Sequence, residues 1–141
     1  GNAHVLLYGY GSYGYSSPTN FSTSRLSLIE RDIIWATAHI RGGMERGMKY
    51  WEEGKMLNKK NTFKDYISCA KFLIDKKFTS KGKIIGYGGS AGGLLMGVVA
   101  NEAPELFLGM IMSVPFVDTL TTNLDHSLPL TVGEFNEFGI I

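Results

Sequence analysis

Cysteine, excess charge and long apolar runs are all scarce in this sequence of 141 residues. The single cysteine, Cys69, excludes an internal disulfide and favours a reducing compartment, so we expect a cytoplasmic protein. The formal net charge of +1 excludes the strongly basic face that nucleic-acid binding requires, and we interpret the run Lys55–Lys60 as a solvated loop before a helix. No apolar run approaches the ~20 residues of a membrane-spanning helix. We therefore expect no nucleic-acid partner and no membrane partner.

The two ends of the sequence lack the signals that open and close a domain. The chain begins without Met, almost directly on a predicted strand, and residues 133–141 stop without a turn or cap. A chain of this length forms one domain or part of one. We expect a piece of a larger domain, cut at both ends.

Strand and helix patterns alternate along the chain. Short apolar runs bounded by glycine or proline predict buried strands at residues 3–8, 33–40, 83–88 and 108–115. Apolar residues at helical spacing predict helices at residues 22–32 and 61–77. A short helix is expected at residues 49–53 within a mixed pattern, and another at residues 91–103, ended by Pro104. Ser22 or Thr23 is expected to cap the helix at residues 22–32, and Asn61 the helix at residues 61–77. The alternation predicts an α/β protein with a mostly parallel, doubly wound sheet.

Glycines crowd the segment around Ser90, where they fit a nucleotide site poorly. Gly86, Gly88 and Ala91 match the dinucleotide pattern G-x-G-x-x-[GA], but the next predicted strand ends in "IMSVP", with no carboxylate to hold a ribose. A second match, starting at Gly9, runs into "YSSPTN" instead of a helix. No Gly-Lys-Ser/Thr follows either glycine group, which excludes a P-loop.

Residues 88–92, Gly-Gly-Ser-Ala-Gly, match the nucleophile elbow G-x-S-x-G. In such an elbow the serine occupies a strained turn between a strand and a helix, and the residues two before and two after it must be tiny. The turn exposes the hydroxyl and directs the next backbone N–H and the helix dipole at an oxyanion. The same glycines would also suit a structural turn that lets a helix pack closely on a strand. The flanking strand and helix favour the nucleophile.

Several segments resemble one known family: "LLYGYGSYG", "AHIRGG", "NTFKDYISCAKFL", "GGSAGGLLMG" and "VPFVDTLTTNLDHSLPLTVGEF". They are similar to the catalytic domain of the prolyl oligopeptidase family, and the last is similar to its oligopeptidase B branch, also called protease II. The resemblance implies an α/β-hydrolase fold with a Ser–Asp–His triad, normally beside a β-propeller that admits only short peptides, and it implies no metal or organic cofactor. We therefore expect residues 1–141 to be a partial catalytic domain without the propeller.

The resemblance also implies roles for single residues. Ser90 matches the nucleophile, the Ala91 N–H matches one oxyanion donor, and the Tyr10 hydroxyl matches the second. The family's acid and base lie beyond residue 141, and neither Asp118 nor His126 matches them. We expect a triad of Ser90 with Asp118 and His126 not to form, so the chain by itself should be inactive.

The resemblance implies cleavage after Arg or Lys, because oligopeptidase B binds that cation with two acids of a "GEFEE"-like segment. Glu134 matches the first acid, Asn136 replaces the second, and Glu137 is expected to point elsewhere. A further acidic pair that favours dibasic sites falls on Pro18 and Asn20. We expect short peptides to be cleaved after a single basic residue, with weakened affinity.

Two other functions stay open at this point. One is a non-catalytic remnant or fragment of such an enzyme. The other is a small-molecule esterase on the same fold, against which the acidic "GEFNEF" segment and the lack of an HGGG loop both count. A parallel sheet cut on one side would also leave an exposed edge, so we expect the piece to self-associate.

Overall fold

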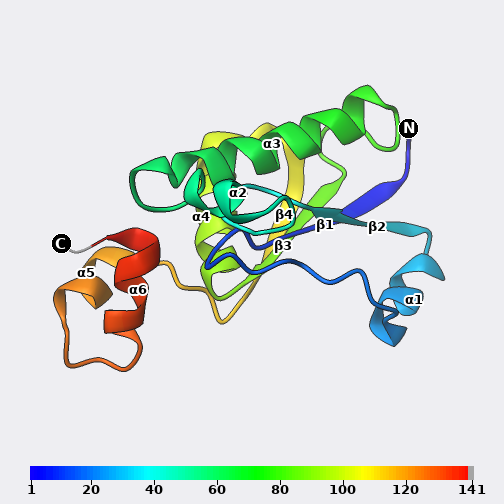
Figure 1. Cartoon of the computed structure of the whole chain (residues 1–141). Helices are drawn as coiled ribbons and strands as arrows, with labels where there is room; N and C mark the ends of the chain where they lie inside the picture. Colours follow the sequence, from blue (N-terminus) through cyan, green and yellow to red (C-terminus); the bar gives the residue numbers. More distant parts are fainter. Residues whose placement is uncertain (140–141) are drawn as a thin grey trace.

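The computed structural model describes residues 1–139 and shows a parallel sheet with helices on both sides (Figure 1). Four strands form the sheet: β1 (His4–Gly9), β2 (Ile33–Ala38), β3 (Ile84–Gly89) and β4 (Phe107–Ser113). Their order is β2-β1-β3-β4, and every neighbouring pair is parallel. The carboxyl ends of all four strands therefore meet at one edge of the sheet, where the loops gather.

The helices connect the strands or follow the last one. In chain order they are α1 (Thr23–Ile29), α2 (Met48–Glu52), the 3-10 turn η1 (Met56–Asn58), α3 (Lys60–Asp75), α4 (Ala91–Glu102), the 3-10 turn η2 (Pro104–Leu106), α5 (Thr119–Leu124) and α6 (Thr131–Phe138). Helices α3 and α4 lie on one face of the sheet and α1 lies on the other, while α5 and α6 stand together beyond the sheet (Figure 1). No helix within residues 1–139 has both the length and the apolar character to span a bilayer.

The core lies between the sheet and helices α3 and α4. Alternate residues of the strands face it, so Val5, Leu7 and Ile84 are at most 1% exposed. From the helices, Tyr66 and Met96 fill the same core and are fully buried.

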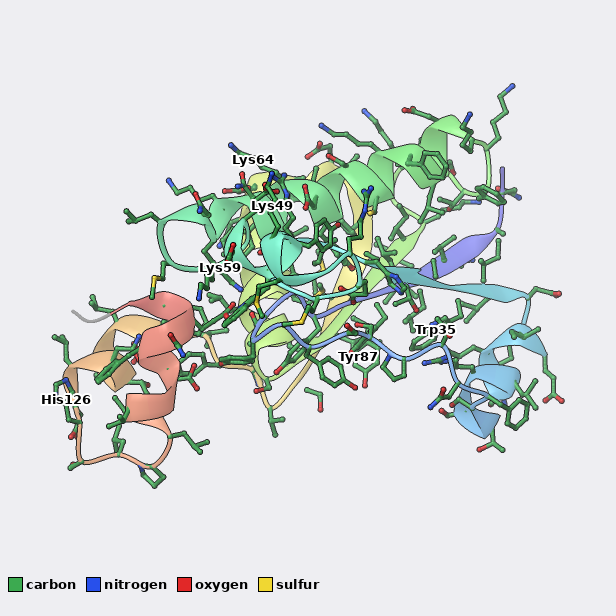
Figure 2. The ribbon with its side chains drawn as sticks, viewed as in Figure 1. Trp35, Lys49, Lys59, Lys64, Tyr87 and His126 are labelled. Carbon is green, nitrogen blue, oxygen red and sulfur yellow. The ribbon has the colours of Figure 1, made fainter. Side chains whose placement is uncertain are left out.

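The opposite face of the sheet is covered only in part. A groove of about 640 Å³ lies there between α1 and the aromatic rings of Tyr8, Trp35 and Tyr87. Figure 2 labels Trp35 and Tyr87 on this side of the sheet. Along the outer strand β4, Leu108 is 59% exposed and Ile111 is 47% exposed. This edge strand therefore presents apolar side chains to solvent.

The predicted order of strands and helices is confirmed, with corrections at three places. Asn61 does not cap α3, which begins one residue earlier with Lys59 at the cap position, and the Asn61 side chain donates to the Glu53 carbonyl instead. Ser22 occupies the cap position of α1 without capping it through its side chain. Helices α5 and α6 were not predicted, because neither carries a long apolar stripe.

Candidate active site

Ser90 occupies the turn that joins β3 to α4. Its backbone has φ 53° and ψ −120°, a region that non-glycine residues rarely adopt and that costs about 1–3 kcal/mol. The Ser90 N–H donates to the Ser113 carbonyl at 3.0 Å, and the Ser90 carbonyl accepts from the Phe116 N–H at 2.9 Å. These bonds to the end of β4 and the segment after it hold the strained turn. The Ser90 side chain is exposed.

The glycines beside Ser90 are required by close backbone approach. A Cβ on Gly88 would lie 2.2 Å from the Gly92 carbonyl oxygen, and a Cβ on Gly92 would lie 2.8 Å from the Gly9 oxygen. The start of α4 therefore passes too close to β3 for a side chain at Gly88, and too close to the end of β1 for a side chain at Gly92. The local geometry predicted for a G-x-S-x-G elbow is present here.

Two hydrogen-bond donors lie beside the Ser90 hydroxyl. Ala91 is the first residue of α4, where backbone N–H groups have no carbonyl partner within the helix and the helix dipole is positive. The Tyr10 hydroxyl, in the loop after β1, lies close to the Ser90 side chain. Burial raises the pKa of Tyr10, and the neighbouring Ser90 side chain opposes that rise only in part. The phenol is therefore protonated and can donate at neutral pH.

None of the chain's three histidines forms a hydrogen bond with Ser90 within residues 1–139. His4 opens β1 and so lies at the opposite end of the sheet from Ser90. His39 follows β2, and its carbonyl accepts the hydroxyl of Tyr50. His126 lies between α5 and α6, well away from the sheet (Figure 2). Among the described residues, the candidate nucleophile is therefore not hydrogen-bonded to a histidine base.

The aspartates near the end of the chain serve local structure. Asp118 caps α5 by accepting the Thr121 N–H at 3.1 Å. Asp125 accepts both the N–H and the hydroxyl of Ser127, and these bonds lower the pKa of Asp125. Both carboxylates are thus engaged within their own turns.

Glu134 lies in the first turn of α6 and faces the loop that carries Tyr10. The Tyr13 hydroxyl donates to Glu134 Oε2 at 2.6 Å. Burial, followed by this bond to Glu134, raises the pKa of Tyr13. The ring of Tyr13 in turn lies 6.2 Å from the ring of Tyr10, centroid to centroid. Contacts therefore lead from Glu134 through Tyr13 and Tyr10 to Ser90.

The other sequence-predicted binding positions are not gathered here. Asn136 follows Glu134 by two positions, about 200° around a helix, and lines a separate pocket with Met56 and Val132. Pro18 and Asn20 are exposed in the segment that leads from β1 to α1. Two carboxylates do lie beside the tyrosine loop: Glu134 accepts from the Tyr13 hydroxyl, and Glu137 accepts from the Tyr13 N–H.

One buried cluster was missed, and it corrects the interpretation of Lys55–Lys60 as solvated. The Lys59 side chain is only 11% exposed, and its Nζ lies 2.7 Å from Glu137 Oε1, whose side chain is 1% exposed. Burial lowers the pKa of Lys59, and the pairing with Glu137 opposes that shift. The residues are 78 positions apart, so no local pattern could pair them.

Within residues 1–139, no group of three or more His, Cys, Asp or Glu side chains is arranged to hold a metal ion. The chemistry that the site itself offers is nucleophilic attack by a serine hydroxyl, with hydrogen-bond donors beside it to hold an oxyanion.

Comparison with known proteins agrees with this geometry. The model of the prolyl oligopeptidase family matches residues 19–141. The chain is 54% identical to Protease 2 of Moraxella lacunata over 99% of its own length and 20% of that protein. It is 48% identical to dipeptidyl aminopeptidase BI of Pseudoxanthomonas mexicana, again over 99% of this chain and 19% of that protein.

Solved structures give the same result. Oligopeptidase B from Leishmania major superimposes with a TM-score of 0.94 at 49% identity, over 98% of this chain and 19% of that one. Oligopeptidase B from Trypanosoma brucei with covalently bound antipain gives a TM-score of 0.94 at 46% identity, over 98% of this chain and 20% of that one. The chain thus spans about a fifth of the length of these relatives.

These likenesses confirm the α/β-hydrolase fold and the predicted resemblance to oligopeptidase B. The family model covers most of the sequence, including the elbow at Ser90 and helix α6. The chain belongs to the prolyl oligopeptidase family of serine peptidases.

Proposed function

We propose that residues 1–141 are part of the catalytic domain of a serine oligopeptidase that hydrolyses short peptides after Arg or Lys. The observation that carries this proposal is the contact between Ser90, exposed on its strained turn, and the Tyr10 hydroxyl. A purely structural turn needs the glycines, but it needs neither an exposed serine nor a protonated phenol beside it.

In this proposal Ser90 Oγ attacks the scissile carbonyl carbon, and its proton passes to a general base. The carbonyl oxygen becomes an oxyanion, which the Tyr10 hydroxyl and the Ala91 N–H stabilise. The C–N bond then breaks, the base returns the proton to the leaving amine, and an acyl ester remains on Ser90. Water hydrolyses this ester and restores the serine. We assign the base and its acid partner to segments outside residues 1–141.

Glu134 is proposed to bind the side chain of the basic residue. Its carboxylate lies beside the loop that contacts Ser90, and a carboxylate can hold a guanidinium by charge-assisted hydrogen bonds. Family membership does not by itself set this preference, because relatives include proteins named prolyl endopeptidase and dipeptidyl aminopeptidase. Asn136 faces another pocket, and Pro18 and Asn20 carry no charge, so we propose weakened affinity and little preference for dibasic sites.

The compartment is inferred from the cysteine. Cys69 lies within α3, and burial raises the pKa of its thiol, so it is a structural residue rather than a reactive one. A single structural thiol suits a reducing compartment, and we propose the cytoplasm.

The test compares reporter peptides that end in Arg or Ala, using the full-length protein that contains this chain. Wild type should prefer Arg, Glu134→Gln should lose much of that preference, and Ser90→Ala should be inactive on both reporters. Equal Arg preference in wild type and Glu134→Gln would contradict the substrate assignment. Full activity of Ser90→Ala would contradict the nucleophile. An active protein that cleaved small esters and no peptides would favour the esterase.

A further inference from the structure

Helix α6 is attached to the rest of the molecule through a small set of side chains. It stands beside α5 beyond the sheet, and no strand covers it (Figure 1). Two of its acids reach the main body: Glu134 accepts from Tyr13, and Glu137 enters a buried cluster. The ring of Phe138 lies 6.3 Å from that of Tyr13 and 5.7 Å from that of Phe116.

Glu137 is the centre of this attachment. Its Oε1 accepts from Lys59 Nζ at 2.7 Å, and its Oε2 accepts from the Tyr13 N–H and from Trp51 Nε1, each at 2.9 Å. The three donors come from the loop after β1, from α2 and from the start of α3. One carboxylate therefore joins three segments of the body to α6.

Lys59 is the charged partner of Glu137 in this cluster. Figure 2 shows Lys59 beside α6. Its Nζ also donates to the Gly11 carbonyl at 2.7 Å and to Ser12 Oγ at 2.6 Å. With Glu137 these acceptors use all three N–H groups of the ammonium. Gly11 and Ser12 directly follow Tyr10, so the same lysine holds both the tyrosine loop and α6.

A buried pair of this kind tolerates little displacement. Losing one partner leaves the other charge buried without compensation, so breaking such a pair is strongly destabilising. Glu137 and Glu134 are three positions apart on one face of α6, so any shift of Glu137 moves Glu134 as well. The distance between Glu134 and Ser90 therefore depends on where Lys59 holds the helix.

We propose that the Lys59–Glu137 pair is a positioning device that fixes α6 against the tyrosine loop and thereby sets the preference for a basic substrate residue through Glu134. Lys59 and Glu137 do not touch the substrate in this arrangement. The effect on substrate preference rests on the proposed function, whereas the attachment of α6 by this pair does not.

The first experiment measures hydrogen exchange by mass spectrometry on the full-length protein. Glu137→Gln keeps the shape of the side chain but presents an amide NH₂ where three donors converge. Amides in peptides covering residues 131–139 should exchange at least about tenfold faster than in wild type, a change that corresponds to about 1.4 kcal/mol of local stability. Peptides covering β3 and α4 should be unchanged, which shows that the domain is folded.

The matched control is Glu53→Gln, which removes the carboxylate of a surface pair. Glu53 lies 3.8 Å from Lys49, whose side chain is 86% exposed, so this substitution should leave exchange in α6 unaltered. Lys59→Met is the second variant and should accelerate the same peptides. Unchanged exchange of α6 in both Glu137→Gln and Lys59→Met would overturn the proposal.

The second experiment measures kcat and KM for the Arg and Ala reporters. Glu137→Gln should raise KM for the Arg reporter several-fold or more and leave KM for the Ala reporter close to wild type, a split that a general loss of stability would not produce. Loss of Arg preference in Glu134→Gln but not in Glu137→Gln would overturn the positioning role. If Glu134→Gln retains the preference for the Arg reporter, both the substrate assignment and the proposed effect of the pair on substrate preference are overturned. The hydrogen-exchange data still decide whether the pair attaches α6.

Discussion

Tyr13 and Glu134, which are 121 positions apart in the chain, are joined by a 2.6 Å hydrogen bond from the tyrosine hydroxyl to the carboxylate. The bond connects the loop that carries the oxyanion candidate Tyr10 to the helix that carries the candidate arginine-binding acid. Reaction and recognition are therefore proposed to share one loop.

The 141-residue chain alone should not react through Ser90. A serine hydroxyl without a base stays protonated at neutral pH, and losing triad members costs a factor of roughly 10⁴ or more in turnover. A fluorophosphonate probe should therefore label the isolated chain no faster than it labels Ser90→Ala. Rapid labelling that depends on Ser90 would mean that His39 or His126 serves as a base.

Tyr10→Phe in the full-length protein should lower kcat with little change in KM. The substitution removes one oxyanion donor and keeps the ring, and loss of one such donor typically costs about 10²–10³ in kcat. Tyr15→Phe is the matched control, because its ring lies 5.3 Å from that of Tyr10 in the same loop. Equal kcat values for the two variants would remove Tyr10 from the mechanism.

Stability of the isolated chain should fall steeply above about pH 10, and Tyr66 should account for part of the fall. Tyr66 is fully buried, its hydroxyl donates to the Leu7 carbonyl at 2.6 Å, and burial raises its pKa. Above that pH the unfolded chain releases this proton and the folded chain keeps it. The folded state then binds more protons, so the free energy of unfolding falls by about 1.4 kcal/mol per pH unit for this group.

Urea unfolding of wild type and Tyr66→Phe, each measured between about pH 9 and 11.5, isolates that contribution. The variant should be less stable by about 1 kcal/mol near neutral pH, because it lacks the hydrogen bond, but it should lose less stability at high pH. Lys59, whose pKa is lowered, acts in the opposite direction in both proteins and cancels in the comparison. Parallel pH dependences would contradict the assignment.

The isolated chain should associate with a second copy through β4. This strand is at the edge of the sheet, and Leu108 and Ile111 on it are 59% and 47% exposed. Light scattering should show dimers or larger species, and Leu108→Lys should reduce them. Leu57→Lys, at a fully exposed position in η1, should not. A monomer at high concentration would contradict the prediction.

Features that depend on neighbouring residues were predictable from the sequence. The strands are short apolar runs, α3 carries its own apolar face, and α4 is apolar along most of its length. The elbow at Ser90 could also be predicted, because the G-x-S-x-G pattern is local and Gly88 is required by the nearby Gly92 carbonyl. Gly92 itself is required by the carbonyl of Gly9, in a strand that only the folded sheet brings beside it. The prediction that Asn61 caps α3 was wrong. The Asn61 side chain donates to the Glu53 carbonyl instead, and the helix pattern of α3 does not indicate that partner.

The sequence by itself therefore determined the parallel α/β framework and the exposed serine, since strand periodicity, helix periodicity and glycine conformation act over a few residues. Only the tertiary structure decided that Lys59 is buried, that Glu137 is its partner and that Glu134 faces Tyr13. Those contacts form between segments that the sheet brings together from 78 to 124 positions apart, and their geometry depends on how α6 docks. No local pattern distinguishes a lysine that will be buried by such docking from one that stays in water.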